Sequence, residues 1–181
     1  MNFCSNCGSA EIKYKVPKGD NRPRWMCQNC TTIHYSNPNI VAGCLPLWED
    51  KVLLCRRAIK PRKGYWNVPG GYLENGERVE DGASREVWEE ALAKVSNLRI
   101  HTIYSLPHIN QVYMHFLGDL EKLEYGVGEE SEEVALFTQD EIPWNEIAFT
   151  SSIFTLKTYY HDLAKGAAEV HIGHFDHEKF L

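Results

Sequence analysis

The sequence predicts an α/β (α+β) fold in which a mixed sheet lies between helices, preceded by a small cysteine-rich segment. Apolar runs with the composition of strands alternate with two helical patterns, in the order strands, helix, strands, helix. That order favours a sheet with helices on its faces. The first 36 residues also contain two Cys-x-x-Cys pairs. The 181 residues suit one globular domain, 37–181, with an appendage, 1–36.

The appendage has the cysteine spacing of a zinc ribbon. Cys4-x2-Cys7 and Cys27-x2-Cys30 are separated by nineteen residues, and such knuckles place four thiolates around one Zn²⁺. A full Cys4 set leaves no open position, so the zinc is expected to be structural and to supply much of the folding free energy. The alternative is a pair of disulfides in a secreted domain. The absence of a signal pattern at the N-terminus favours zinc in a reducing cytoplasm.

Three strands are expected first in the main domain. They cover residues 40–48, 52–57 and 65–68, after a boundary turn at 37–39. Pro46 predicts an edge or a bulge in the first strand. Arg56 and Arg57 end the second strand, where a guanidinium can grip a phosphate in bidentate fashion. The alternative for both arginines is surface solubility.

Further strands are expected at 95–106, 111–120 and 134–137, and a second helix at 151–165. Hydroxyl residues at its start suit an N-cap, and Gly166 is its expected stop. An acidic loop with two glycines precedes the last of these strands. The tail, with His171, His174 and His177, is expected to be an edge strand or a loose end.

The stretch from Gly70 to Ala93 is predicted to form the centre of the protein's chemistry. A helical pattern in it gathers Glu86, Glu89 and Glu90 on one face, at i, i+3 and i+4. Like charges so placed repel, and a hard cation such as Mg²⁺ or Mn²⁺ would neutralise them. The alternative is a solvated acidic helix face.

The spacing within this stretch is that of a known motif. Gly71, five residues, Glu77, seven residues and then REVWEE match the Nudix box, G-x5-E-x7-R-E-U-x-E-E-x-G-U, where U is a bulky aliphatic residue. The chain therefore resembles a Nudix hydrolase over residues 37–165. It departs at the end of the box, where Leu92 stands at the glycine and Ala93 at the last aliphatic position.

The resemblance implies an α/β/α Nudix sandwich and a metal-dependent hydrolase of nucleoside diphosphate derivatives. It also implies roles for individual residues. The expected ligands of the catalytic Mg²⁺ or Mn²⁺ are Glu86, Glu90, Glu89 and the carbonyl of Gly70. Arg85 would orient a carboxylate, and Glu77 would brace the loop against the helix. The residues expected to bind substrate are Arg56, Arg57 and Gly71.

The general base is expected to come from the acidic loop, as in Nudix enzymes that act on ADP-ribose. Glu133 is the first choice there, with Glu130 and Glu132 as neighbours. Glu89 on the helix is the alternative. The expected catalytic set is thus Glu89, Glu86, Arg85 and Glu133. Rings that could stack on a base are Trp66, Tyr72, Tyr104, His108 and Tyr113, with core packing as the alternative for each.

The expected substrate is FAD or ADP-ribose, from which hydrolysis releases AMP. The stretches GCLPLWEDKVLLCRRAI and GEESEEVALFTQDEIPWNEIAF resemble the group that includes plant Nudix hydrolase 23, an FAD and ADP-ribose pyrophosphatase. A ribbon before a Nudix domain also resembles the NADH pyrophosphatases, although the SQPWPFP-type signature is here SLPHINQ. The alternatives are therefore an NADH pyrophosphatase, an RNA-cap hydrolase and a catalytically silent nucleotide-binding module.

Composition limits the partners. No apolar run approaches the roughly 18 residues of a membrane span. The net charge of −6 argues against a nucleic-acid partner, because phosphate binding usually shows as a basic patch. A nucleotide remains compatible, since a bound cation reverses the local charge. The resemblance allows a homodimer. The ribbon is expected to stabilise the main domain, with substrate gating, dimer contact or nucleic-acid contact as alternatives.

Overall fold

The structure, a computed structural model, describes residues 1–175. Its contacts divide the chain into two compact units, Met1–Asn37 and a second from Pro38 onward. His177 of the expected tail lies outside the described residues. Within the described part, no helix has both the length and the apolar character needed to cross a membrane.

The first unit is a small antiparallel sheet with hardly any apolar interior. Its strands are β1 (Ile12–Lys15), β2 (Arg24–Cys27) and β3 (Ile33–His34). Tyr14 and Trp25 form a cross-strand pair with ring centroids 5.0 Å apart. The only buried residues among those described in this unit are Cys4, Pro17 and Cys27. Because so little apolar surface is removed from water, the unit needs a further cross-link to stay folded.

The second unit contains an eight-stranded mixed sheet, which confirms the predicted fold class. The strand order is β10-β5-β4-β9-β8-β11, with β6 added to β5 and β7 added to β4. β4 pairs parallel with β9, and β11 pairs parallel with β8. The strands are β4 (Asn39–Trp48), β5 (Lys51–Arg57), β6 (Trp66–Asn67), β7 (Gly70–Tyr72), β8 (Val95–Leu106), β9 (Gln111–Leu120), β10 (Ser131–Phe137) and β11 (His171–His174).

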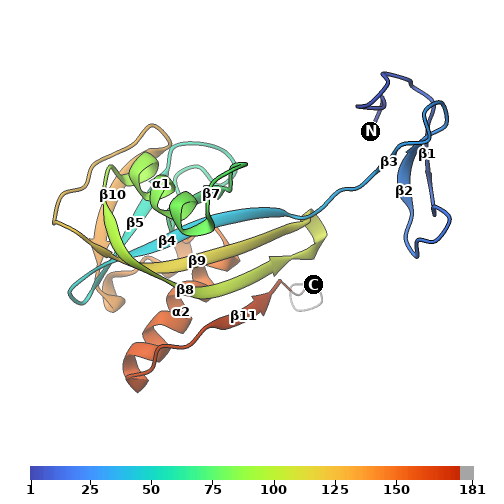
Figure 1. Ribbon diagram of the computed structural model, residues 1–181. Helices are drawn as coiled ribbons and strands as arrows, with labels where there is room; N and C mark the ends of the chain where they lie inside the picture. The colour runs from blue at the N-terminus through green and yellow to red at the C-terminus, as the bar shows by residue number, and fades with distance from the viewer. Residues whose placement is uncertain (176–181) are drawn as a thin grey trace. The chain divides into compact units, whose positions relative to one another are not determined.

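Two helices cover the two faces of this sheet, α1 (Val79–Ala91) and α2 (Thr150–Lys165) (Figure 1). Side chains alternate along β5: Leu53 packs in the core beneath α1 and Leu54 in the core beneath α2. A strand buried on both faces is continuously apolar, which explains the run VLLC. The connections also contain the short helices η1 (Pro107–Ile109), η2 (Gln139–Glu141) and η3 (Trp144–Glu146).

The expectation for Pro46 was wrong. β4 is a central strand and not an edge. On one side β4 pairs with β7 through Val41–Gly43 and with β5 only from Leu47 onward. Pro46 lies in the gap between these two partners, where no ladder bond needs its missing N–H. The histidine tail forms an edge strand, β11, as far as it is described.

Candidate active site

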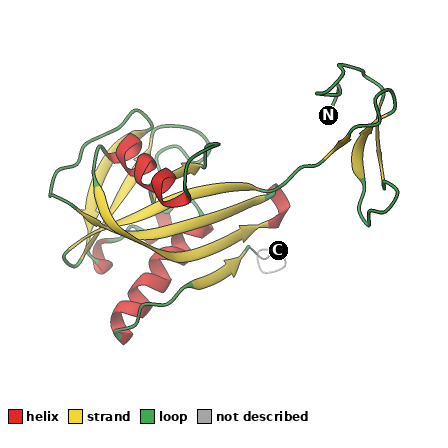
Figure 2. Ribbon diagram, in the orientation of Figure 1, coloured by secondary structure: helices red, strands yellow, loops and turns green. Residues whose placement is uncertain are grey.

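The acidic helix α1 borders a cavity of about 1250 Å³ in the second unit. Its walls come from α1, β7, the loop after β5, the loop before β10 and the first residues of α2. Figure 2 shows the long loops gathered around α1. The sheet therefore fixes the helix, and loops complete the cavity.

Two of the helix glutamates that border the cavity are buried. Glu86 is 9% exposed and Glu90 is 5% exposed. The Gly70 N–H donates a hydrogen bond of 3.1 Å to Glu90 Oε1. A Cβ on Gly71 would lie 2.5 Å from Glu86 Oε1, so a side chain at that position would displace the carboxylate. The glycine pair and the helix thus form one packed unit.

Burial disfavours the ionised form of both carboxylates. It raises the pKa of Glu90 to about 8, and the charge of Glu86 adds to the effect, while the Gly70 N–H opposes it. Burial also raises the pKa of Glu86, against the opposing influence of Arg85. A divalent cation that takes oxygen ligands would supply the missing charge. The donor set and its surroundings therefore fit Mg²⁺ or Mn²⁺.

Arg85 connects three glutamates. Its Nε and Nη2 donate to the two oxygens of Glu77 at 3.1 and 2.8 Å. Its Nη1 donates to Glu86 Oε1 at 2.6 Å and to Glu89 Oε2 at 3.0 Å. The guanidinium lowers the pKa of Glu77 to about 2. Glu77 also accepts the backbone N–H of Glu74 at 2.7 Å. Arg85 and Glu77 thus join the loop to the helix and hold the other carboxylates in orientation.

The loop before β10 lies on the C-terminal end of α1. The Gly126 N–H donates to the Ala91 carbonyl at 2.8 Å, and the Gly128 N–H donates to the Glu90 carbonyl at 3.0 Å. These bonds satisfy carbonyls that a helix end leaves unpaired. A Cβ on Gly128 would lie 1.8 Å from the Glu89 carbonyl oxygen. The contact brings Glu129 and Glu130 to the cavity wall.

Glu133 does not join the other carboxylates. It is exposed, and it accepts a hydrogen bond of 3.4 Å from Arg56 Nη1, beside it on β5. Glu132 pairs with Lys63 at 3.2 Å. Neither Glu133 nor Arg56 borders the cavity. The charge of Glu130, in contrast, raises the pKa of both Glu86 and Glu90.

Arg57 is the arginine of β5 that faces the cavity. Its guanidinium carbon lies 5.1 Å from the centroid of the Phe149 ring, and its Nε donates to the Pro61 carbonyl at 2.9 Å. The cavity also includes two cations that the sequence did not single out, Lys60 and Arg62. In the sequence, the only indication of these two residues was a basic loop after a strand. Phe149, at the start of α2, had none.

The five rings considered for base stacking divide into two groups. Tyr72, His108 and Tyr113 border the cavity. Trp66 and Tyr104 are buried, and Trp66 packs in the core beneath α2. Core packing therefore accounts for those two.

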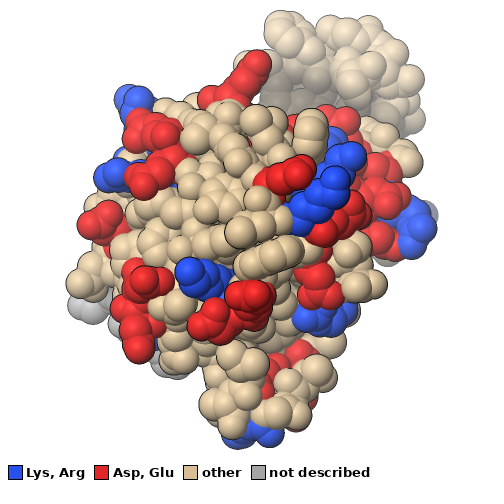
Figure 3. Space-filling model, turned by 90° about the vertical axis from the view of Figure 1, so that its left-hand side faces the viewer, with Lys and Arg blue, Asp and Glu red and all other residues tan. Residues whose placement is uncertain are grey.

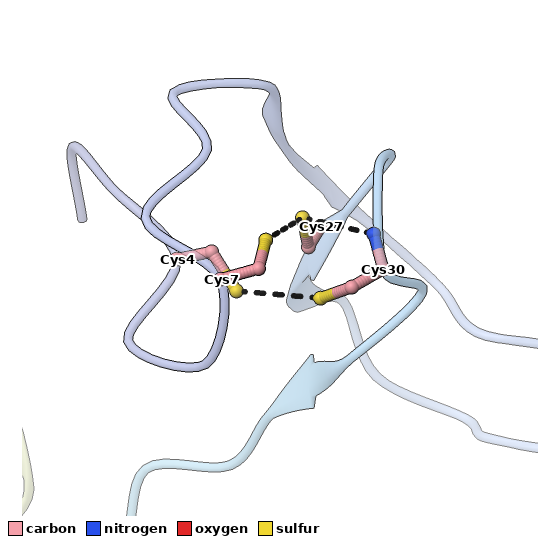
Figure 4. Close-up of side chains that lie close together, drawn as sticks. All are labelled: Cys4, Cys7, Cys27 and Cys30. Carbon is pink, nitrogen blue, oxygen red and sulfur yellow. Dashed lines mark hydrogen bonds between the residues drawn. The ribbon is translucent and has the colours of Figure 1, made fainter.

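The four cysteines of the first unit come together as predicted (Figure 4). Cys4 and Cys30 have their sulfurs 3.6 Å apart, and so do Cys7 and Cys27. All four sulfurs lie within 4.8 Å of one another. Tetrahedral zinc with bonds of about 2.3 Å separates its sulfurs by about 3.8 Å. All six cysteines of the chain are described, and none forms a disulfide. The set fits a structural zinc.

Comparison with known families covers both units of the chain. Residues 37–156 match the NUDIX domain, and residues 2–36 match the zinc ribbon described as Nudix N-terminal. The chain belongs to the Nudix family. Family membership and the two ligand sets fit a divalent cation such as Mg²⁺ or Mn²⁺ at α1 and structural zinc in the ribbon.

Curated Nudix relatives include the NAD-capped RNA hydrolase NudC of Edwardsiella ictaluri, 31% identical over 121 residues. These residues are 65% of this chain and 43% of the relative. The NudC of Photobacterium profundum is 30% identical over 126 residues, 68% of this chain and 44% of the relative. The chain thus spans less than half the length of these two relatives. They support the NAD-type alternative better than the plant FAD and ADP-ribose group.

A solved Nudix structure matches nearly the whole chain. The NUDIX hydrolase from Nitrosomonas europaea is 48% identical, with a TM-score of 0.92, over 97% of this chain and 99% of that one. An ADP-ribose pyrophosphatase from Streptococcus suis is 22% identical, with a TM-score of 0.61, over 77% of this chain and 100% of that one. The second likeness shows the shared fold alone.

The departures from the Nudix box lie just after the carboxylates. Leu92 caps α1 in the left-handed conformation, with φ 49° and ψ 29°. Glycine adopts that conformation without strain, whereas a side chain does so at a cost of about 1 kcal/mol or more. Ala93 is buried at 1% exposure. The substitutions therefore affect the helix end, and the geometry of Glu86 and Glu90 is complete.

Proposed function

We propose that the protein hydrolyses the diphosphate bond of an NAD-type dinucleotide, either free or as the 5′ cap of RNA. The observation that carries the proposal is that side chains of both charges line one cavity. Buried Glu86 and Glu90 border it, together with Arg57 at the end of β5 and Lys60 and Arg62 on the loop that follows. A diphosphate fits between a carboxylate-bound cation and guanidinium groups. The named function of the NudC relatives adds support.

The reaction adds water across the phosphoric anhydride. A water oxygen bonds to one phosphorus as that phosphorus loses the bridging oxygen, which leaves on the other phosphate. Two monophosphates result, one of them still joined to RNA when the substrate is a cap. A bound divalent cation would neutralise phosphate charge and make the water more acidic. Side chains would position the cation, bind the phosphates and accept the proton of the water.

Each side chain has a part in this proposal. Glu86 and Glu90 would hold the cation, with Glu89 beside them, and the Gly70 N–H orients Glu90. Arg85 positions Glu86 and Glu89. Arg57 binds a phosphate, and Gly71 gives Glu86 its space. The Gly70 carbonyl remains a proposed ligand.

For the general base we propose Glu130 in place of Glu133. Glu130 borders the cavity, and its backbone carbonyl accepts a hydrogen bond of 2.8 Å from the Ala58 N–H. Glu89 is a weaker candidate because Arg85 already offsets its charge.

An RNA substrate would make use of the exposed loop cations. Lys60 and Arg62 are exposed beside the cavity, where phosphates that follow a cap would reach them. On the face shown in Figure 3, acidic side chains surround an uncharged area and basic ones occur in small separate groups. RNA contact is therefore proposed for the loop at the cavity and not for a broad basic surface.

FAD and ADP-ribose form a second candidate class. The resemblance of residues 43–59 and 128–149 to the plant group supports it. For the compartment we propose the cytoplasm, which the six unpaired cysteines support.

The test is product analysis with Mg²⁺ or Mn²⁺ on NAD, NADH, NAD-capped RNA, FAD and ADP-ribose in parallel. Nucleoside monophosphates from NAD-type substrates, at the highest kcat/KM of the set and absent with Glu90→Gln, are the expected result. A higher kcat/KM on FAD or ADP-ribose would select the second candidate. A folded, metal-loaded protein that cleaves none of them would be a binding module.

A further inference from the structure

A second group of metal-ligand side chains lies beneath α2, outside the active-site cavity. His101 of β8, Asp162 of α2 and His171 of β11 bring one ligand atom each to within 4.8 Å of the others. His101 is 2% exposed and Asp162 is 5% exposed. The three come from separate elements, with Asp162 and His171 nine residues apart and His101 distant in sequence. The active site uses none of them.

Hydrogen bonds determine which nitrogen of His101 is available. Its Nε2 lies 3.1 Å from Thr158 Oγ1. That hydroxyl has one proton, which the Phe154 carbonyl accepts at 2.9 Å or the Thr155 carbonyl at 3.1 Å. When Thr158 gives that proton to a carbonyl, it accepts a hydrogen bond from the His101 Nε2–H. In the neutral ring, Nδ1 then has a lone pair, and Nδ1 is 4.0 Å from Asp162 Oδ2.

This arrangement is common among metal-binding histidines. Such a histidine usually donates its second N–H to a nearby oxygen, which fixes the tautomer and directs the other nitrogen at the ion. Nδ1 of His101 and Oδ2 of Asp162 lie 4.0 Å apart, so an ion between them would be within reach of both. His171 Nε2 approaches the same Asp162 oxygen at 2.9 Å. An atom between these groups that accepts electron pairs would satisfy all three.

The distances suit a small divalent ion. Tetrahedral zinc with bonds of about 2.1 Å separates its ligand atoms by about 3.4 Å. The observed separations of 2.9 and 4.0 Å lie on either side of that value. His101 and Asp162 also border a second cavity of about 710 Å³. An ion therefore has a path to the cluster and room for a water ligand.

We propose that His101, Asp162 and His171 bind a transition-metal dication of the zinc class. Two imidazoles and one carboxylate favour such ions over Mg²⁺, which prefers oxygen ligands alone. The ion takes the lone pair of His171 Nε2 in the neutral ring whose single proton is on Nδ1. The competing arrangement is a clamp without metal, in which Asp162 accepts from His171 and from the Glu169 N–H at 3.2 Å.

The site fastens the strand that reaches the active-site cavity. β11 begins at His171, and Phe175, just after its end, borders that cavity. The Phe175 N–H donates to the Ser105 carbonyl at 2.9 Å. A metal at the start of β11 thus holds this strand against β8. This consequence for substrate rests on the proposed function, whereas metal binding does not.

The experiment compares bound cobalt in the full chain and in single variants. Demetallated wild type, Asp162→Asn, His171→Ala and the control His161→Ala are titrated with Co²⁺. Thiolate-to-cobalt charge-transfer bands report the ribbon, and ligand-field bands without them report a nitrogen and oxygen site. His161 is exposed and adjoins Asp162, and all four proteins share the ribbon and the α1 carboxylates.

We expect wild type and His161→Ala to bind one more equivalent of Co²⁺ than Asp162→Asn and His171→Ala. Thiolate bands should be equal in all four, which shows that each ribbon is folded; circular dichroism checks the main domain. Equal stoichiometry in all four proteins would overturn the proposal in favour of the clamp. A variant that fails to fold is replaced by Zn²⁺ protection of wild-type His171 from diethyl pyrocarbonate, read by peptide mass. Unprotected His171 at saturating Zn²⁺ would also overturn the proposal.

Discussion

The ribbon and helix α1 both gather metal ligands, but they do so in opposite ways. The ribbon's four sulfurs come from two short turns and lie within 4.8 Å of one another. The glutamates of α1 are held in place by hydrogen bonds from the protein itself, from Arg85 and from the Gly70 N–H. A closed thiolate set stabilises a fold, whereas carboxylates beside a cavity leave positions for substrate and water. The ribbon's zinc would stabilise a unit that lacks an apolar core. The cation at α1 would neutralise an excess of negative charge.

Zinc removal should give the largest effect and should be confined to the ribbon. Structural zinc in such small domains supplies about 10 to 16 kcal/mol at pH 7, and this unit buries only three of its described residues. A chelator or Cys27→Ser should therefore unfold residues 1–37. NMR spectra would show ribbon resonances collapse while those of the sheet persist. Ribbon resonances that stay dispersed without metal would contradict this.

Glu90→Gln should lower kcat by about 10³-fold or more, because a metal ligand supplies several kcal/mol of transition-state stabilisation. The same change should stabilise the metal-free protein at pH 8. The folded pKa of Glu90, about 8, is raised, so its stabilising contribution is complete below the unfolded value near 4.5 and is lost as pH rises through 8.

Thermal melts at pH 5 and pH 8 would test this, with exposed Glu124→Gln as the control. A lower Tm for Glu90→Gln than for wild type at pH 8 would contradict the interpretation that the buried charge of Glu90 destabilises the metal-free protein.

Replacing Glu130 and Glu133 in turn should show which of them is the general base. Removal of a general base lowers kcat by about 10² to 10⁴-fold, so Glu130→Gln should lose activity while Glu133→Gln keeps nearly all of it. Initial rates at saturating substrate and Mg²⁺ measure the difference. The reverse order would return the base to Glu133, and full activity in both would favour Glu89.

Metal affinity should depend on pH at α1. Because Glu90 must lose its proton to bind the ion, Mn²⁺ affinity should rise about tenfold per pH unit up to about 8 and then level off. Electron paramagnetic resonance counts free Mn²⁺ directly. Affinity that is constant from pH 6 to pH 8 would mean that Glu90 is ionised throughout.

Leu92→Gly should give the smallest change, a gain of about 0.5 to 1 kcal/mol in the free energy of unfolding. The left-handed conformation strains leucine but not glycine. Urea unfolding measures it, and kcat should stay the same. A loss of stability would show that the contact of Leu92 with Gly126 outweighs the strain.

The sequence was most informative where ligands are close along the chain. Helical periodicity put Glu86 and Glu90 on one face, and the Cys-x-x-Cys spacing located the ribbon. It was least informative about contacts between distant segments. Nothing local distinguishes Glu130 from Glu133, because two glycine N–H groups on the end of α1 decide which one reaches the cavity.

Neighbouring residues of a strand show the same limit. Arg56 and Arg57 point to opposite sides of β5, so only one can serve the cavity. The register with β10 gives that place to Arg57 and pairs Arg56 with Glu133. The cluster of His101, Asp162 and His171 has no motif at all, since three separate elements supply it.

The contact between Gly128 and the end of α1 also offers a way to compare sequences. A side chain at that position would collide with the Glu89 carbonyl. An alignment of the loop can therefore be anchored at this glycine. In a related chain with a loop of different length, the residue two places after this glycine would be the one to align with Glu130. Counting acidic residues from the strand would align the wrong one.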